Sequence, residues 1–313
     1  MDPFVFIVGC ARSGTTLLQR MLDAHPLLAI LPEMHWITSP FKKGRWFAHR
    51  CVVQAEAVRQ LTEHEMFPQL EISADDFVRC AGAGKPVRCG KFLGKLFALY
   101  SQARGKPLVG SKTPAYVRRL GTLHTLWPAV RFVHLIRDGR AVCLSVLNWD
   151  HAARAAGRYA AWSEDPVVTT ALWWRRKVKL GQEGGRRLGS ELYYELRYES
   201  LVRQPAAECA KLCAFLGLPY DEAMVRFHDS RQRIDSPGHP WLPIMPGLRN
   251  WRTQMPLEDI ERFEAAAGDL LDELSYPRAV REPRSQVLAH ASRIRVLFTQ
   301  DTCSRRELLP ESW

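Results

Sequence analysis

The residues with the clearest capacity for chemistry lie at positions 9–16, where the sequence reads GCARSGTT. Two glycines in this stretch let the backbone curl and approach a ligand closely. One cation and three hydroxyl groups are available, from Arg12, Ser13, Thr15 and Thr16. This set suits a tetrahedral oxyanion such as a phosphate or a sulfonate. We therefore predict an anion-binding loop.

The surroundings of this loop agree with that interpretation. An apolar run over residues 4–8 precedes it and a helix-periodic run over residues 17–22 follows, which indicates a strand-to-helix turn. The free N–H groups and the dipole of such a helix favour an anion. The spacing matches the phosphate loop G-x-x-x-x-G, but Thr15 stands where nucleotide-hydrolysing enzymes have lysine. A tight connection without a ligand is the alternative.

Further candidates follow three other predicted strands. Glu33 comes after the run 27–31, Lys112 after 107–110 and Arg137 at the end of 130–136. In open α/β sheets ligands bind outside the carboxyl ends of the strands, so we expect these side chains to lie near the loop. A solvated glutamate is the alternative for Glu33. Ser145 lies two turns into a helix that begins at Asp138, and it could point toward a ligand.

The elements that must position these residues alternate along the chain. Predicted strands at 4–8, 27–31, 107–110, 130–136 and 192–196 alternate with helical patterns. This alternation predicts an α/β fold with a central parallel sheet flanked by helices. We expect one domain over residues 1–277, in which residues 40–105 form a helical cap on the acceptor side, and a basic C-terminal extension over 278–313. The Ala-, Arg- and Gly-rich segment 152–165 is predicted to be mobile.

Composition and charge exclude some classes of function but do not identify one. The chain has 313 residues, 46% of them hydrophobic, and a net charge of +11, which fits an anionic ligand. No nucleic-acid signature appears, and no apolar run is long enough to span a membrane. No leader is recognisable, so we expect a cytoplasmic protein. Eight cysteines without a C-x-x-C pair predict neither a disulfide framework nor a metal site.

The ordered set of motifs resembles the PAPS-dependent sulfotransferases, in particular their bacterial and tyrosylprotein-sulfotransferase-like branch. The motifs are GCARSGTT at 9–16, DAHP at 23–26, PE at 32–33, KTP at 112–114, LIRDGR at 135–140 with Ser145, and YESL at 198–201. The likeness runs from Phe4 to about Tyr276. It implies a phosphate-loop α/β fold and a sulfonate donor, PAPS.

The resemblance also implies roles for single residues. The 5′-phosphosulfate would be bound by Arg12, Ser13, Gly14, Thr15 and Thr16. The 3′-phosphate would be bound by Arg137 and Ser145, and Tyr198 and Trp251 would be further donor contacts. Glu33 matches the general base of the family and Lys112 its lysine at the transferring group. No metal is required, since arginine and lysine supply the cations.

This sequence departs from the family in its late motif and at the acceptor side. The late motif lacks Lys-Gly, and Gln254 stands near a lysine of the tyrosylprotein enzymes. Contacts of Arg249, Arg252, Ser236 and His239 with the donor stay open. His35 stands near an arginine that those enzymes use on acidic peptides. A protein-tyrosine acceptor is therefore disfavoured. We expect the acceptor to be a hydroxyl, with an amine as second choice, on a small molecule or glycan.

Two other classes of function stay open at this point. A phosphate-loop kinase would use ATP and magnesium, and Thr15 at the lysine position argues against it. A non-catalytic binder of nucleotides or polyanions would exploit the positive charge. The sequence indicates neither the oligomeric state nor the role of the C-terminal extension.

Overall fold

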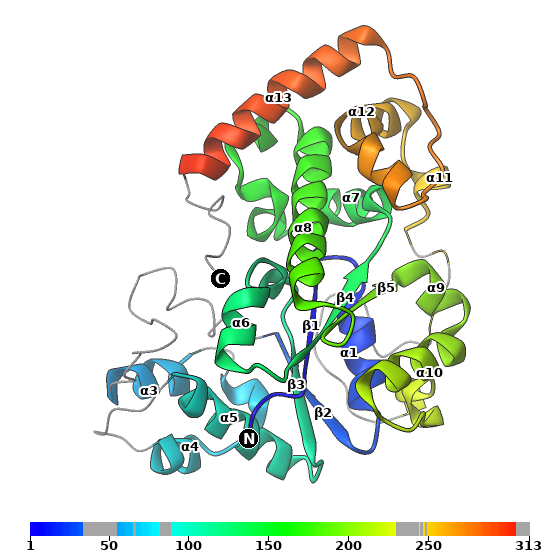
Figure 1. Ribbon diagram of the computed structural model, residues 1–313. Helices are drawn as coiled ribbons and strands as arrows, with labels where there is room; N and C mark the ends of the chain where they lie inside the picture. Colours follow the sequence, from blue (N-terminus) through cyan, green and yellow to red (C-terminus); the bar gives the residue numbers. More distant parts are fainter. Residues whose placement is uncertain are drawn as a thin grey trace.

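Five parallel strands form the centre of the protein in the spatial order β2-β3-β1-β4-β5 (Figure 1). In the computed structural model the described residues are 1–33, 55–64, 67–81, 89–229, 244, 247 and 249–304. The strands are β1 Val5–Gly9, β2 Leu28–Leu31, β3 Leu108–Lys112, β4 Arg131–Ile136 and β5 Tyr193–Arg197. The predicted parallel α/β sheet is therefore confirmed.

Helices cover both faces of this sheet. Their bounds are α1 Thr15–Asp23, α3 Ala55–Thr62, α4 Ala74–Ala81, α5 Cys89–Ala103, α6 Leu120–Leu126, α7 Gly139–Leu147, α8 Pro166–Leu188, α9 Tyr198–Arg203, α10 Pro205–Leu216, α11 Trp251–Gln254, α12 Leu257–Glu273 and α13 Ser285–Ser304. Short 3₁₀ turns join several of them.

Strand β1 lies in the middle of the sheet and is buried on both faces. Its four apolar residues, at positions 5–8, are 0% exposed. Phe6 packs on one face against Phe97 of α5 and Trp127, while Ile7 belongs to the core on the other face. A continuous apolar run is what a parallel strand covered on both sides requires. The core therefore fixes the strand that leads into the anion loop.

The segment predicted as a helical cap contains α3, α4 and α5 in its described part. Phe92 and Phe97 of α5 are buried and pack in the same core as Phe6 of the sheet. These helices therefore help to cover one face of the sheet (Figure 1). Residues 34–54 and 82–88 lie outside the described residues, and the acceptor-side role of the segment stays a prediction.

The prediction that residues 152–165 are mobile was wrong. They form three short 3₁₀ turns, η3 Ala152–Arg154, η4 Ala156–Arg158 and η5 Ala160–Ser163. Ala156, Tyr159 and Ala161 are buried, and the Tyr159 ring lies 4.5 Å from that of Phe298, centroid to centroid. The alanines are small enough for these turns to pack closely in the core. Residues 152–165 are therefore a tightly packed segment, although they are rich in Ala, Arg and Gly.

The C-terminal extension contains a helix that the weak periodicity of the sequence did not predict. Helix α13 packs against α8 and α12, with Ala291, Ile294 and Phe298 buried in their common core (Figure 1). These positions are spaced as one face of a helix requires. Val296 and other exposed apolar residues lie between them and obscure the pattern.

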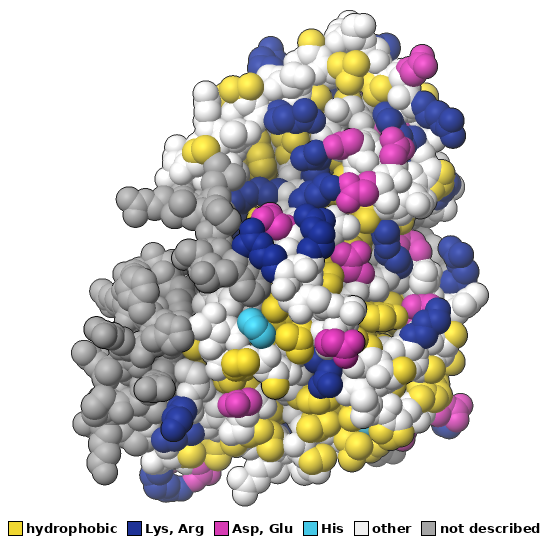
Figure 2. All heavy atoms as spheres, viewed as in Figure 1, with side chains coloured by type: hydrophobic (Ala, Val, Ile, Leu, Met, Phe, Trp, Pro, Cys, Tyr) yellow, Lys and Arg dark blue, Asp and Glu magenta, His cyan; other side chains and the backbone are white. Residues whose placement is uncertain are grey.

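Side chains of both charges lie beside one another on one face of the protein. Figure 2 shows Lys and Arg side chains gathered in the middle of one face, where Figure 1 places α8, with Asp and Glu side chains beside them. Arg175 of α8 pairs with Asp269 of α12 at 2.5 Å, and Lys179 pairs with Glu273. On this face, acids therefore interrupt the positive charge.

The packing of α13 gives a prediction for stability. Ile294→Ala should lower the free energy of unfolding by about 2–5 kcal/mol, because it removes a fully buried side chain and leaves a cavity. Val296→Ala is the matched control, since Val296 is 56% exposed, and should change the stability by less than about 0.5 kcal/mol. Urea denaturation measures both. Equal, small effects would mean that α13 does not pack on the domain.

Candidate active site

The candidate residues lie at one edge of the sheet. Each of the five strands either ends in a candidate residue there or is followed by a candidate residue or loop. In the spatial order of the strands, these are Glu33 after β2, Lys112 at the end of β3, the loop after β1, Arg137 after β4 and Tyr198 after β5. Neighbouring parallel strands have their carboxyl ends at the same edge. The structure therefore lines up Glu33 and Lys112 on one side of the loop and Arg137 and Tyr198 on the other.

The loop between β1 and α1 has an unusual backbone. Gly14 and Arg12 have φ values of 94° and 69°, in the left-handed region. A non-glycine residue in this region is strained and is often found at functional sites. Gly14 is the N-cap of α1 and provides no side-chain hydrogen bond, and the first turn of the helix carries no acid. The first N–H groups of α1 thus keep the polarity that an anion requires.

Tyr198 packs directly against this loop. A Cβ atom on Gly14 would lie 2.5 Å from two carbons of the Tyr198 ring, so only glycine allows this approach. The guanidinium of Arg137 lies over the same ring, 4.2 Å from its centroid. Burial raises the pKa of Tyr198, which keeps its hydroxyl neutral and able to donate a hydrogen bond. Loop, Arg137 and Tyr198 form one contiguous cluster.

The hydroxyl groups of the loop are differently placed. Ser13 is fully buried, and its Oγ atom has no hydrogen-bond partner among the described residues. Thr15 is also buried, whereas Thr16 is half-buried. Buried polar atoms are nearly always satisfied in folded proteins. The orphaned Ser13 hydroxyl therefore fits a site that accommodates a polar ligand.

Arg12 directs its side chain toward α7. Its Nε atom donates to Oγ of Ser145 at 3.0 Å, and its guanidinium lies over the ring of Trp149, 5.0 Å from the centroid. Nη1 of Arg137 donates to the carbonyl oxygen of Arg12 at 3.3 Å. The structure thus brings Arg12, assigned by resemblance to the 5′ side, next to Ser145, assigned to the 3′ side. Trp149 was not predicted as a site residue, although its spacing of four residues from Ser145 is that of one helix face.

Positive charges converge around Arg12. Burial lowers the pKa of its guanidinium, and Arg249 and Arg137 lower it further, while Glu33 acts in the opposite direction. Arg249, whose role the sequence left open, is therefore within electrostatic reach of the loop. Like charges held together in a partly buried place favour the binding of an anion.

Glu33 and Lys112 form an ion pair across the ends of β2 and β3. Nζ of Lys112 lies 2.9 Å from Oε2 of Glu33. The Lys112 side chain is 6% exposed and that of Glu33 is 36% exposed, so the carboxylate faces the more open side. The ammonium of Lys112 thus holds the Glu33 carboxylate in place through a charge-assisted hydrogen bond. The structure therefore brings these two candidate residues into direct contact.

Trp251 lies behind the site. Its Nε1 atom donates to Oδ2 of Asp138 at 2.9 Å, and its ring contacts the guanidinium groups of Arg140 and Arg252 at 3.6 and 4.3 Å from the centroid. Trp251 is also buried in the core beside α7. Its contact with a donor stays a prediction. His35, Ser236 and His239 lie outside the described residues.

Cys10, inside the loop, is not available as a nucleophile. It is 1% exposed, and burial raises the pKa of its thiol far above the ordinary value. A buried, protonated thiol is inert. Cys10 therefore serves the loop as a small neutral side chain. In the described part of the chain, no group of three or more His, Cys, Asp or Glu side chains could hold a metal ion.

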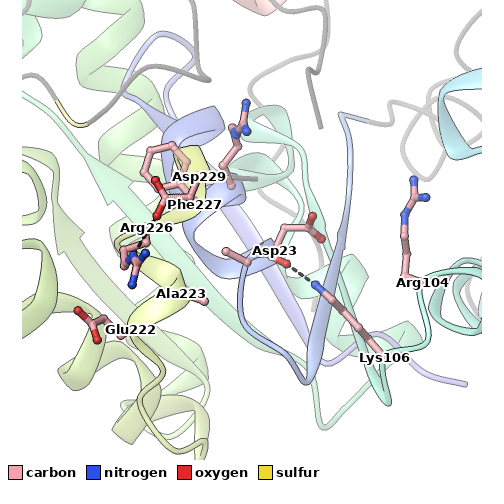
Figure 3. A pocket seen from close by; sticks show the side chains of 10 residues that line it. Asp23, Arg104, Lys106, Glu222, Ala223, Arg226, Phe227 and Asp229 are labelled. Atoms are coloured by element: carbon pink, nitrogen blue, oxygen red, sulfur yellow. Dashed lines mark hydrogen bonds and ion pairs between the residues drawn. The ribbon is translucent and has the colours of Figure 1, made fainter. Parts of the chain in front are cut away.

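A separate cavity of about 600 Å³ lies at the opposite end of α1 from the loop. Figure 3 shows side chains of both charges around it, with Lys106 reaching toward Asp23. Nζ of Lys106 donates to the carbonyl oxygen of Asp23, and Arg226 pairs with Asp229 at 2.9 Å. None of the residues assigned to the active site lines this cavity. Several distant segments contribute to it, so local patterns could not predict it.

The fold and the loop together define a phosphate-loop α/β protein, and comparison with known proteins identifies the family. A profile described as the sulfotransferase family matches residues 3–222. The chain therefore belongs to the sulfotransferase family and is a sulfotransferase.

Individual relatives agree with this assignment. The nodulation protein NoeE of Sinorhizobium fredii is 27% identical over 89% of this chain and 67% of its own length. The omega-hydroxy-beta-dihydromenaquinone-9 sulfotransferase Stf3 of Mycobacterium bovis is 27% identical over 90% of this chain and 77% of its length. Protein-tyrosine sulfotransferase A of Caenorhabditis elegans is 23% identical, and the match spans 72% of this chain and 52% of that protein.

Solved structures share the fold. The sulfotransferase domain of the Synechococcus PCC 7002 olefin synthase has a TM-score of 0.59 at 24% identity, covering 88% of this chain and 95% of that domain. The corresponding domain of the curacin biosynthetic pathway has a TM-score of 0.55 at 17% identity, covering 94% and 98%. Within the described ranges, no helix combines the length and apolar character needed to cross a membrane.

The close approach of Gly14 and Tyr198 gives a second prediction. Gly14→Ala should lower the free energy of unfolding by about 2–4 kcal/mol, from left-handed strain and the clash with the ring together. Gly105→Ala is the control, because Gly105 has φ +63° and nothing within 4 Å of a Cβ atom. It should lose only about 1 kcal/mol. If thermal and urea denaturation gave the same loss for both variants, Tyr198 would not pack on the loop.

Proposed function

We propose that the protein transfers a sulfonate group from PAPS to a hydroxyl group of a small molecule or glycan. The observation that carries this proposal is the order of side chains along the sheet edge, in which an acid–lysine pair and an arginine flank an anion-binding loop. Such an order offers one place for a doubly phosphorylated nucleotide and, beside it, one place for a proton transfer.

The donor would lie across the loop and the end of β4. The uncapped first turn of α1 and the orphaned hydroxyl of Ser13 suit the 5′-phosphosulfate. Arg137 and Ser145 suit the 3′-phosphate, and Arg12 contacts both through its carbonyl oxygen and its side chain. A phosphate held by a guanidinium forms strong, charge-assisted hydrogen bonds. These residues fit PAPS without a metal.

The transfer itself would take place beside Lys112. The acceptor oxygen attacks sulfur, the bond between sulfur and the phosphate oxygen breaks, and the acceptor proton passes to the Glu33 carboxylate. Lys112, 2.9 Å from Glu33, would then face the negative charge that develops on the sulfonate oxygens and the leaving phosphate. A fixed cation there stabilises the transition state more than the ground state.

The acceptor is proposed as an alcohol or phenol. The names of the relatives Stf3 and protein-tyrosine sulfotransferase A both specify hydroxyl acceptors, one on a modified menaquinone and one on a protein. His35, near the position of an arginine used on acidic peptides, favours a small molecule or glycan over a protein tyrosine. The amine remains the second choice.

A kinase and a polyanion binder are the rival functions. The first helical residue, Thr15, stands where a phosphate-loop kinase has its lysine. On the one face that Figure 2 shows, acids lie beside the basic side chains, whereas a polyanion binder needs a continuous positive surface. Both observations favour the sulfotransferase reaction.

The first functional prediction concerns the base. Glu33→Gln should lower turnover by about 100-fold or more, because the amide cannot accept the proton, while the affinity for PAP, the product nucleotide, should stay within about twofold. Glu63→Gln, at an exposed surface pair with Arg59, is the control and should leave both unchanged. Steady-state rates and calorimetry provide the numbers. Normal turnover in Glu33→Gln would remove Glu33 from the mechanism.

Lys112 should affect the rate more than binding. Lys112→Ala removes a cation aimed at the transferring group, so turnover should fall at least about tenfold further than PAP affinity does. Lys91→Ala, on α5, is a control that should affect neither. Comparable losses of rate and of PAP affinity would instead identify Lys112 as an ordinary binding residue.

Arg137 should determine the preference for a 3′-phosphate. The wild-type protein should bind PAP at least about tenfold more tightly than AMP, since charge-assisted hydrogen bonds contribute about 1.5–3 kcal/mol each. Arg137→Ala should lose most of this preference and retain its affinity for AMP. Calorimetric titration with both nucleotides measures the ratio. Equal binding of PAP and AMP by the wild type would contradict the proposed function.

A further inference from the structure

A tryptophan without a role so far lies just after α7, beside the anion loop. Trp149 follows Ser145 by about one helical turn, and both side chains contact Arg12. The Arg12 guanidinium lies over the Trp149 ring, 5.0 Å from its centroid, and its Nε atom donates to Oγ of Ser145 at 3.0 Å. Trp149 is half-buried and packs against the core around α7 and α8. Arg12 is therefore held at one edge and on one face.

The outer edge of the Arg12 guanidinium suits a ligand. Its Nε atom is bound by Ser145, whereas its two terminal nitrogens form no hydrogen bond within the described residues. The N–H groups of these nitrogens lie in one plane. They form the fork that binds a phosphate or a sulfonate through two parallel hydrogen bonds. The direction of this plane then decides how well an anion fits.

Arg12 needs support to keep that plane fixed. Its φ of 69° lies in the left-handed region, which is strained for a residue with a Cβ atom and persists only where other contacts fix it. Arg249 and Arg137 repel its charge. The face of an indole attracts a cation without adding a negative charge that would compete with an anion. Trp149 therefore suits the task of holding Arg12 better than a carboxylate would.

We propose that Trp149 is a positioning residue for the donor site. Its ring fixes the plane of the Arg12 guanidinium, so that the terminal nitrogens are aimed at the 5′-phosphate of the donor before the nucleotide binds. Less affinity is then lost in ordering a long, flexible side chain when the ligand arrives. This inference rests on the proposed function, because the phosphate that Arg12 receives is that of PAPS.

The indole N–H is not needed for this task. Nε1 of Trp149 is buried and has no hydrogen-bond partner in the described part of the chain. Phenylalanine at this position would keep an aromatic face for Arg12 and lose no hydrogen bond of the structure. Leucine would remove the aromatic face and keep an apolar side chain. The two substitutions therefore separate stacking on Arg12 from simple filling of the core.

The experiment compares the affinities for PAP and for adenosine 3′-phosphate, which lacks the 5′-phosphate. In Trp149→Leu the ratio of the two affinities, measured by calorimetry, should fall about fivefold, because the ligand itself must then order Arg12. The affinity for adenosine 3′-phosphate should stay within about twofold. Trp149→Phe should keep most of the ratio. Trp162→Leu, at another partly buried tryptophan of the same core, is the matched control and should keep the wild-type ratio.

A double-mutant cycle identifies Arg12 as the residue through which Trp149 acts. When Arg12→Ala is already present, adding Trp149→Leu should change the ratio by less than about twofold. A merely structural role of Trp149 would lower the affinity for both nucleotides, since α7 also carries Ser145, and that effect would persist without Arg12.

The outcomes separate this inference from the proposed function. A wild-type ratio that Trp149→Leu retains, that Trp149→Phe loses to the same extent, or that falls equally without Arg12 would overturn the inference alone. Equal binding of PAP and AMP by the wild type would overturn the proposed function and this inference with it. If Trp149→Leu does not fold, Trp149→Met replaces it with the same expected fall, because its flexible side chain fills space without an aromatic face.

Discussion

The position of β1 between β3 and β4 is the constraint on which the site depends. The backbone of β1 pairs with both neighbours, Ile7 lying opposite Lys112 and Gly9 opposite Leu135. This register sets the height of the anion loop relative to the ends of the other strands. A register shift of one residue would turn the side chain of Lys112 to the other face of the sheet. The chemistry therefore depends on main-chain hydrogen bonds deep in the core.

Convergent positive charge is the second feature that shapes the site. The Arg12 guanidinium is held close to Arg137 and Arg249, and this repulsion lowers its pKa in addition to burial. Contacts with Ser145 and with the rings of Trp149 and Tyr198 help to hold the two loop-side arginines in place. Asp138 and Glu199 bind to other groups. The fold thus holds like charges close together, and an anionic ligand would reduce the repulsion between them.

The sequence predicted the strands and the site residues at their ends, because both follow from local patterns. Apolar runs bounded by turns identified the sheet, and the strand ends then placed Glu33, Lys112 and Arg137 at one edge. Local patterns cannot predict contacts between segments that are distant in the sequence. The approach of Arg12 to Ser145, 133 residues away, depends on packing that periodicity does not reveal. For the same reason the burial of residues 152–165 and the helix α13 were not predicted, since an Ala-, Arg- and Gly-rich segment indicated mobility and the scattered apolar side chains of the extension indicated no helix.

The measurement that tests the central claim most directly offers the protein both donors at once. PAPS labelled with heavy sulfur, together with ATP and magnesium, would be incubated with a panel of alcohols, phenols, amines and glycans, and products analysed by intact mass. The isotope separates sulfonate from phosphoryl transfer, which add almost the same mass. The account predicts a labelled sulfonate on a hydroxyl acceptor that disappears in Glu33→Gln. Phosphoryl transfer, or sulfonate transfer unaffected by that substitution, would contradict it.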